Sequence, residues 1–385
     1  MKFFHTADWH LGKLVQGVYM TEDQRFVLNQ FTEAVKQEKP DAVIIAGDLY
    51  DRAVPPTEAI DLLDEVLRKI VIEYKIPVIA VAGNHDSPGR LQFGSQMMNA
   101  AGYYMVGEFS DQFESIVLHD EFGEVHFHLV PYAEPGKVRY VLQKDEIRTY
   151  DEAMEATVER IQENMDHNAR HVFVGHAFVT PYGEKAANTS ESERPLSMGG
   201  TEYVSADHFS SFHYTALGHL HQAHYVKNET IRYAGSPLKY SISEEKHNKV
   251  FYIVELDEQG QTNIEKRALT PKRDMYTIEG KLEEIEQMDK NEDYVFVRLL
   301  DETPVLSPME RVRTVFPNAM HVERKISMTQ LNDQEEQVVE RSKMDELSLF
   351  KAFYKEVRGT EVTGETEKQF TEVLQEMLQV EGERK

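Results

Sequence analysis

The stretch IPVIAVAGNHD, residues 76–86, decides how this chain folds and where its chemistry lies. Residues 76–82 form a short apolar run, which predicts a fully buried strand. Gly83 then allows the backbone to turn sharply. Asn84-His85-Asp86 follows, so an amide, an imidazole and a carboxylate stand at the carboxyl end of that strand. Open α/β sheets keep their functional sites at this edge.

The residues before this stretch predict a parallel sheet covered by helices. Lys2–Thr6 and Asp41–Ala46 are further apolar strands, and amphipathic patterns predict helices over Glu22–Glu38 and Pro55–Glu73. Strands that alternate with helices form βαβ units. Such units place their strands in one parallel sheet with helices on its faces.

The residues beyond about 100 predict a second sheet. Their pattern favours antiparallel pairing and begins with a hairpin of Glu114–His119 and Glu124–Pro131. Further apolar strands are expected at Arg170–Val174, Tyr214–Leu217 and Val250–Leu256. Packing this sheet on the first buries an apolar face of each.

The chain divides into four expected parts. Residues 1–271 form the main body, and residues 272–327 repeat a β-α-β-α-β pattern on a smaller scale, which predicts an independent α+β domain. Residues 328–342 are rich in Gln, Glu, Asp and Asn and are expected to be a linker. Residues 343–385 contain two amphipathic helices, and their apolar stripes predict docking either on the body or on a partner helix.

The composition excludes several classes of protein. The chain has no cysteine, so disulfides and thiolate metal sites are ruled out, and a cytoplasmic location is expected. No apolar run is as long as a membrane span, and the first residues lack the layout of a secretory signal. The net charge of −25 counts against DNA as a partner, unless bound metal ions neutralise part of it.

Five strand ends carry groups that can bind metal ions. A single histidine after an apolar strand is usually structural, but five such ends are hard to explain by packing alone. Carboxylates, an amide and imidazoles without a thiolate suit Mn²⁺, Fe or Zn²⁺ better than Mg²⁺ or Ca²⁺. Two ions about 3.5–4 Å apart can clamp both oxygens of a displacement at phosphorus. The residues at these ends are Asp8, His10, Asp48, Asn84, His85, His176, His219 and His221.

These residues stand in five sequence blocks that together resemble the calcineurin-like metallophosphoesterases. The resemblance implies an α/β fold, a four-layer α/β/β/α sandwich with a small capping domain and C-terminal helices. The residue sequence of the first three blocks is similar to that of the DNA nucleases within this family. The blocks are Asp8-x-His10, Gly47-Asp48-x-x-Asp51, Gly83-Asn84-His85-Asp86, Gly175-His176 and Gly218-His219-x-His221.

The resemblance also implies two divalent metal ions, with Mn²⁺ preferred, and a role for each ligand. The first ion would be held by Asp8, His10 and His221, the second by Asn84, His176 and His219, and Asp48 would bridge the two.

Three further residues receive roles by the same resemblance. His85 would face the scissile phosphate, where it stabilises the transition state or protonates the leaving oxygen. Asp51 would orient that imidazole and favour its charged form. Arg52 follows directly and could contact a phosphate.

The activity implied is hydrolysis of DNA, both as a double-strand exonuclease and as an endonuclease on hairpins and single strands. The implied partners are DNA and a coiled-coil ATPase subunit that binds the C-terminal helices, in a complex built on a homodimer. No membrane partner is expected.

Two other functions stay open on the sequence. A small-molecule or protein phosphoesterase would share the metal ligands but would not need the small domain and the terminal helices. A non-catalytic scaffold that tethers DNA would have no reason to keep His85 and Asp51. Cleavage assays with DNA and with small phosphate esters separate these functions.

Overall fold

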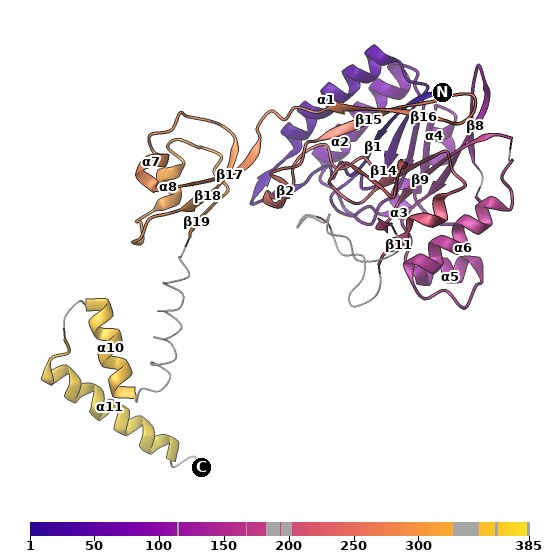
Figure 1. The fold of residues 1–385 in the computed structure, drawn as a ribbon. Helices are drawn as coiled ribbons and strands as arrows, with labels where there is room; N and C mark the ends of the chain where they lie inside the picture. The colour runs from indigo at the N-terminus through magenta and orange to yellow at the C-terminus, as the bar shows by residue number, and fades with distance from the viewer. Residues whose placement is uncertain are drawn as a thin grey trace.

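The body of the protein is a sandwich of two six-stranded sheets with helices on both outer faces (Figure 1). The computed structural model describes residues 1–113, 115–166, 168–181, 193, 202–325, 346–358 and 361–382.

The first sheet has a parallel centre and an antiparallel edge. Strands β1, β4, β5 and β6 run parallel, while β15 and β16 continue the sheet from β1 in antiparallel pairing. The parallel part agrees with the βαβ prediction, but the strand Val250–Leu256 was expected in the second sheet and instead pairs with β1 in the first. The strands are β1 (Lys2–Thr6), β4 (Ala42–Ala46), β5 (Val78–Val81), β6 (Tyr103–Val106), β15 (Val250–Leu256) and β16 (Thr262–Ala268).

The second sheet is mixed, so the prediction of antiparallel pairing was wrong for its centre. The hairpin β7–β8 is antiparallel as expected, but β8, β9, β12 and β14 are parallel neighbours. The connection from β8 to β9 contains two helices and is long enough for the crossover that parallel strands need. The strands are β7 (Ile116–Asp120), β8 (Gly123–Val130), β9 (Arg170–His176), β12 (Tyr214–Gly218), β13 (His224–Val226) and β14 (Asn228–Tyr233).

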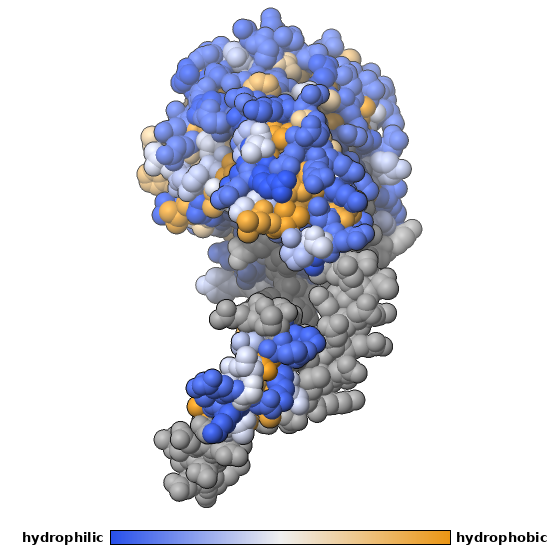
Figure 2. All heavy atoms as spheres, turned by 90° about the vertical axis from the view of Figure 1, so that its left-hand side faces the viewer, coloured by the Kyte–Doolittle hydropathy of each residue, from blue (hydrophilic) through white to orange (hydrophobic). Residues whose placement is uncertain are grey.

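Helices cover the outer face of each sheet and complete four layers. Leu28 and Phe31 of α1 and Leu62 of α2 pack on the first sheet, and Val138 of α5 and Ile161 of α6 on the second. Hydrophilic side chains predominate on the face drawn in Figure 2, where apolar ones gather in a patch. The helices are α1 (Thr21–Glu38), α2 (Thr57–Leu67) with a π-helical turn (Arg68–Glu73), α3 (Pro88–Gln92), α4 (Ser95–Asn99), α5 (Pro135–Leu142) and α6 (Tyr150–Gln162).

The core between the sheets holds them face to face. Phe3 of β1 contacts Phe127 of β8 and Tyr214 of β12 edge-on, with ring centroids 5.9 and 5.5 Å apart. All three side chains are fully buried. The four-layer α/β/β/α arrangement is therefore confirmed.

A smaller unit follows the body and has its own core. Its three parallel strands are covered by two short helices, with Ile285, Val297 and Val312 fully buried between them. It also contacts the body, because Tyr294 packs with Val27 and Tyr240 in one shared apolar cluster. Its elements are β17 (Met275–Gly280), α7 (Leu282–Ile285), β18 (Tyr294–Leu299), α8 (Pro308–Val312) and β19 (His321–Arg324).

Two helices, α10 (Glu346–Arg358) and α11 (Gly364–Gly382), lie at the C-terminal end. The rings of Phe350 and Phe370 stack between them, with centroids 3.9 Å apart. The expected linker, residues 328–342, lies outside the described residues. Within the described part of the chain, no helix is both long and apolar enough to cross a membrane.

Candidate metal centre

The strand ends singled out in the sequence converge on one place between the two sheets. The loops after β1, β4 and β5 meet the end of β9 and the loop after β12. Metal-capable side chains gather there in three overlapping groups whose ligand atoms lie within 4.8 Å of one another. The groups are Asp8, His10 and His221; Asp8, Asp48 and His176; and His10, Asp51 and His85.

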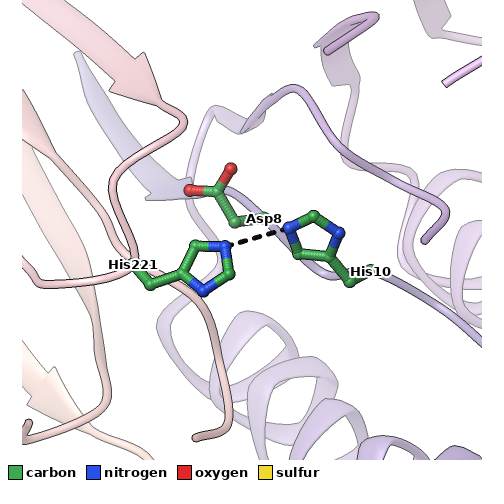
Figure 3. A group of neighbouring side chains, drawn as sticks. All are labelled: Asp8, His10 and His221. Carbon is green, nitrogen blue, oxygen red and sulfur yellow. Dashed lines mark hydrogen bonds between the residues drawn. The ribbon is translucent and has the colours of Figure 1, made fainter. Parts of the chain in front are cut away.

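The first group joins β1 to the loop after β12 (Figure 3). The Nε2 atoms of His10 and His221 are 3.0 Å apart. Neutral imidazole nitrogens this close together, each with a free lone pair, could both be ligands of one divalent ion. The carboxylate oxygen Oδ2 of Asp8 is buried beside them without a hydrogen-bond partner. These side chains fit a shared divalent cation.

A second set of ligand atoms lies on the other side of Asp48. The amide oxygen of Asn84 is 2.9 Å from Nε2 of His176 and 3.3 Å from Nδ1 of His219. The other ring nitrogen of His176, Nδ1, is 3.0 Å from the main-chain oxygen of Ala46. A carbonyl oxygen only accepts, so Nδ1 carries the proton and Nε2 keeps a free lone pair.

Asp48 lies between the two sets. Its Oδ2 atom is 3.5 Å from Nε2 of His10 and 3.5 Å from Nε2 of His176. Its Oδ1 atom accepts a hydrogen bond of 2.9 Å from the main-chain nitrogen of His85. One carboxylate therefore reaches both groups of imidazoles.

The electrostatics of the cluster also fit bound cations. Burial and the neighbouring Asp48 carboxylate raise the pKa of Asp8 well above its ordinary value. Burial and the adjacent imidazoles lower the pKa values of His10 and His219 well below theirs. The centre thus holds buried carboxylates beside neutral imidazoles, and a divalent cation compensates such carboxylates.

The backbone at the centre is strained. Asp8, His10, Asp48 and His219 all have positive φ, at 54°, 45°, 51° and 111°. Such conformations cost non-glycine residues of order 1–3 kcal/mol each and cluster at functional sites. These backbone conformations direct the side chains from the strand ends into the centre. They could not be predicted from the composition of the sequence.

Glycine allows the loops to approach each other closely. A Cβ atom on Gly83 would lie 2.1 Å from Oδ1 of Asp48, and one on Gly218 would lie 1.9 Å from the main-chain oxygen of Ala46. These separations are far below van der Waals contact. Gly83 and Gly218 are therefore required by the packing of the centre.

His85 lies at the centre, but the contact predicted for Asp51 is not the one observed. Nδ1 of His85 is 2.8 Å from the main-chain oxygen of Asp51. The Asp51 carboxylate is 2.8 Å from the Lys13 ammonium and 3.8 Å from Nδ1 of His10. Since the Asp51 carboxylate is engaged elsewhere, the main chain holds the imidazole. Arg52 is exposed, and in the described part of the chain no hydrogen bond or ion pair links it to the cluster.

Sequence reasoning named Asp86 in a ligand block but gave it no role, and it missed other groups that hold the ligand loops. Asp86 accepts hydrogen bonds from the main-chain nitrogens of Gly83, Leu49 and Tyr50 at 2.9–3.1 Å and so ties the loops after β4 and β5 together. Burial and Asp48 raise the pKa of Asp86 to about 7. The position of Asp86 directly after His85 was the sequence signal that could have indicated this role.

Gln24 of α1 holds the first ligand loop in the same way. Its amide nitrogen donates to the main-chain oxygen of His10 at 2.8 Å, and its amide oxygen accepts from the nitrogen of Gly12 at 3.1 Å. Glu244 and Lys249 form a buried ion pair beside His221. No spacing in the sequence connects these residues to the ligand blocks.

Comparison with known proteins identifies the family of the chain. Residues 1–223 match the family model of the calcineurin-like phosphoesterases. Residues 271–358 match the SbcD C-terminal model, described as the type 5 capsule protein repressor C-terminal domain. A protein of Staphylococcus epidermidis, named as the SbcD subunit of the nuclease SbcCD, is 32% identical over 386 residues, covering 99% of this chain and 100% of its own length.

The chain belongs to the SbcD family of calcineurin-like phosphoesterases. A second relative, the SbcD subunit of the nuclease SbcCD of Staphylococcus saprophyticus, is 33% identical over 383 residues, covering 98% of this chain and 99% of its own length. The family makes this chain an enzyme that hydrolyses phosphate esters.

Two solved structures resemble this SbcD-family chain at low sequence identity. The protein TT1561 of Thermus thermophilus covers 70% of this chain and 99% of its own, with 12% identity and a TM-score of 0.40. A dimetal phosphatase of Danio rerio covers 70% and 96%, with 14% identity and a TM-score of 0.39.

Proposed function

We propose that this chain is the metal-dependent nuclease subunit of an SbcCD-type complex and hydrolyses phosphodiester bonds in DNA. The observation that carries the proposal is the convergence of oxygen and nitrogen ligands around Asp48, in a chain whose relatives are named as nuclease subunits. The small-molecule phosphoesterase stays the alternative that experiment must exclude.

The proposed centre would hold two divalent ions, and Mn²⁺ would suit its mixture of carboxylate, amide and imidazole ligands. Bound ions of this kind polarise a phosphate and provide a nucleophile at neutral pH by lowering the pKa of bound water. The residues proposed to hold them are Asp8, His10 and His221 for the first, Asn84, His176 and His219 for the second, and Asp48 between them.

His85 is the proposed catalytic group outside the ligand set. Its Nδ1–H donates to the main-chain oxygen of Asp51, which leaves Nε2 as the nitrogen that meets the substrate. The ring is only half-buried, and its centroid is 4.7 Å from that of His10. In this role His85 acts in its doubly protonated form, with a proton on Nε2 as well, and it stabilises the charge on the phosphate or gives that Nε2 proton to the leaving oxygen.

Asp51 and Lys13 provide the setting for His85. The Asp51 main chain fixes the imidazole, and the Asp51 carboxylate places the Lys13 ammonium 2.8 Å away at the same edge of the centre. An ammonium in this place favours an anionic substrate. Arg52, exposed on the same loop, is a proposed contact to a neighbouring phosphate.

The remaining parts of the chain serve assembly in this proposal. Residues 1–271 form the nuclease body, residues 272–327 the cap, residues 328–342 the linker, and residues 343–385 the segment that binds an SbcC-type ATPase. Leu349 and Phe353 of α10 and Val373 of α11 are exposed, as a helix-binding segment requires.

Two copies of this chain form the core of the proposed complex with two SbcC-type subunits. Phe93, between α3 and α4, is 84% exposed, and Met97, within α4, is 81% exposed. Both offer an apolar surface for the second copy. The complex acts in repair, recombination and replication of DNA in the cytoplasm, at the nucleoid.

A substrate comparison tests the proposal. The purified chain with Mn²⁺, alone and with an SbcC-type subunit and ATP, is offered a blunt duplex, a hairpin, a bis-aryl phosphodiester and an aryl phosphomonoester. Cleavage of duplex ends and of the hairpin is the expected result. Hydrolysis of the aryl esters alone, under all conditions, would keep the metal centre and reject DNA as the substrate.

A further inference from the structure

A buried carboxylate lies directly behind one of the proposed metal ligands. Glu244, the last residue of a 3₁₀ turn (Ile242–Glu244), is fully buried, and its Oε1 atom is 3.0 Å from Nδ1 of His221. An ionised carboxylate only accepts, so Nδ1 of His221 carries the proton. The other nitrogen, Nε2, then has a free lone pair and points at Nε2 of His10, 3.0 Å away (Figure 3).

The ammonium of Lys249 holds this carboxylate in place. Lys249 precedes β15, and its side chain is only 5% exposed. It donates to the carboxylate of Glu244, to the hydroxyl of Ser236 at 2.8 Å and to the main-chain oxygen of His221 at 3.0 Å. Lys249 therefore contacts both the carboxylate behind the imidazole and the backbone that carries the imidazole.

Glu244, Lys249 and His221 contact one another, and the main chain of His221 also bonds to the Glu193 carboxylate and to the main-chain nitrogen of Ser236. The main chain of His221 is held by Lys249, its ring by Glu244, and these two by each other. The ammonium has three donors and makes three hydrogen bonds, so its donors are satisfied. Such a network favours the observed orientation of the ring.

Stability alone does not explain this pair. Two charges buried together lose so much hydration that apolar residues of similar size often stabilise a protein equally well or better. A carboxylate that fixes the tautomer and orientation of a metal-binding imidazole has a functional purpose. The closest comparison within the chain is His176, whose Nδ1 is held by the uncharged main-chain oxygen of Ala46.

We propose that Glu244 and Lys249 are positioning residues that orient His221 as a metal ligand and set the affinity of the ion it shares with Asp8 and His10. The inference rests on the proposed metal centre. It adds residues from a turn far from the ligand blocks in sequence, and it assigns them to one of the two ions only.

The same turn offers a matched control. Glu245 is the next residue, and its carboxylate accepts a hydrogen bond of 3.0 Å from the main-chain nitrogen of Thr277 in β17. It therefore faces the smaller unit rather than His221. Glu245→Gln changes the same functional group one position away and is expected to leave metal binding unchanged.

The test is a titration of the metal-free full chain with Mn²⁺ by calorimetry and by fluorescence. Trp9 is the only tryptophan of the chain, is buried, and stands between Asp8 and His10, so its emission reports on the first ion. In Glu244→Ala one of two binding events is expected to weaken about 10–100-fold, while the other stays as in the native chain.

A second variant keeps the proposal testable if Glu244→Ala fails to fold. Glu244→Gln combined with Lys249→Met removes both charges, keeps an oxygen near His221 and leaves no unpaired buried ion. This double variant is expected to melt close to the native chain and still bind one ion about tenfold more weakly.

Three results separate the claims. Native affinity at both sites in the double variant would overturn the positioning role. Equal weakening at both sites would also overturn it, because it would indicate a general loss of structure. A native chain that binds no Mn²⁺ at all would overturn the proposed metal centre itself, and with it the role assigned to the ion pair.

Discussion

Nδ1 of His85 is 2.8 Å from the main-chain oxygen of Asp51, whereas the Asp51 carboxylate is 2.8 Å from the Lys13 ammonium. The residue that orients the proposed catalytic imidazole therefore does so through its backbone. This relationship changes what substitution of Asp51 should do.

Replacing the Asp51 side chain should leave most of the activity. Asp51→Asn keeps the carbonyl that holds His85, so kcat on a DNA hairpin should fall only a few-fold. His85→Gln removes the acid itself and should cost about 10²–10⁴-fold. Steady-state rates of both variants at saturating Mn²⁺ provide the comparison. Equal loss in the two variants would show that the carboxylate, not the main chain, matters for His85.

Removal of single ligands should distinguish a bridging residue from a residue of one site. Asp48 lies 3.5 Å from a nitrogen of His10 and of His176, so Asp48→Asn should weaken both binding events. Asn84→Ala should weaken one, because the Asn84 amide lies beside His176 and His219 of the second set. Calorimetric titration with Mn²⁺ measures both variants. A single weakened event in Asp48→Asn would contradict the bridging position.

Bound metal should raise the melting temperature. A ligand at 100 times its Kd stabilises the folded state by about 2.7 kcal/mol, which corresponds to a shift of about 5 °C for a body of the size of residues 1–271. Melting curves with EDTA and with Mn²⁺ test this prediction, and Asp48→Asn is the matched control. An identical shift in that variant would place the stabilising ion elsewhere.

A methyl group at Gly83 should disrupt the centre. It would lie 2.1 Å from Oδ1 of Asp48, an oxygen fixed by the main-chain nitrogen of His85. Gly83→Ala is expected to cost about 2 kcal/mol or more and to abolish tight metal binding. Gly89→Ala, where the nearest atom is the end of the flexible Glu108 side chain at 3.2 Å, is the control. Native metal binding in Gly83→Ala would contradict the packing described.

The metal-free fold should lose stability in mild acid. Burial lowers the pKa values of His5 and His128 from 6.5 to about 3. Between these values the unfolded chain binds protons that the folded chain does not, so stability falls as the pH drops below 6.5. Each histidine contributes about 1 kcal/mol per pH unit in that window.

Urea unfolding at pH 7.5, 6.0 and 5.0 measures this dependence. In His128→Gln the slope of the unfolding free energy against pH should fall by close to one proton. His119→Gln, an exposed substitution on the same sheet, controls for the loss of a histidine. A slope unchanged in His128→Gln would show that His128 does not contribute to the acid sensitivity.

The sequence predicted the location of the centre because local patterns determine it. Buried strands followed by glycine and a polar group are visible in single segments, and parallel strands bring their carboxyl ends to one edge. His176 and Asn84, 2.9 Å apart, were found in this way although they belong to different sheets.

Other features depended on long-range contacts and could not be read from patterns. Pairing in the second sheet depends on crossovers through α5 and α6. An apolar strand has the same sequence pattern whether its neighbours are parallel or antiparallel. Glu244 and Gln24 reach the ligand loops from a 3₁₀ turn and from a helix, at spacings that no motif contains. Which part of Asp51 meets His85 depends on loop conformation rather than on residue type.

The most direct test of the proposed nuclease centre is cleavage of a labelled DNA hairpin and a blunt duplex with Mn²⁺, by the native chain and by His85→Gln. Both are first shown by calorimetry to bind two ions. We expect cleavage by the native chain and a loss of at least about 10²-fold in the variant. Equal cleavage by the two, or cleavage by neither even with an SbcC-type subunit and ATP, would contradict the proposed role of the centre.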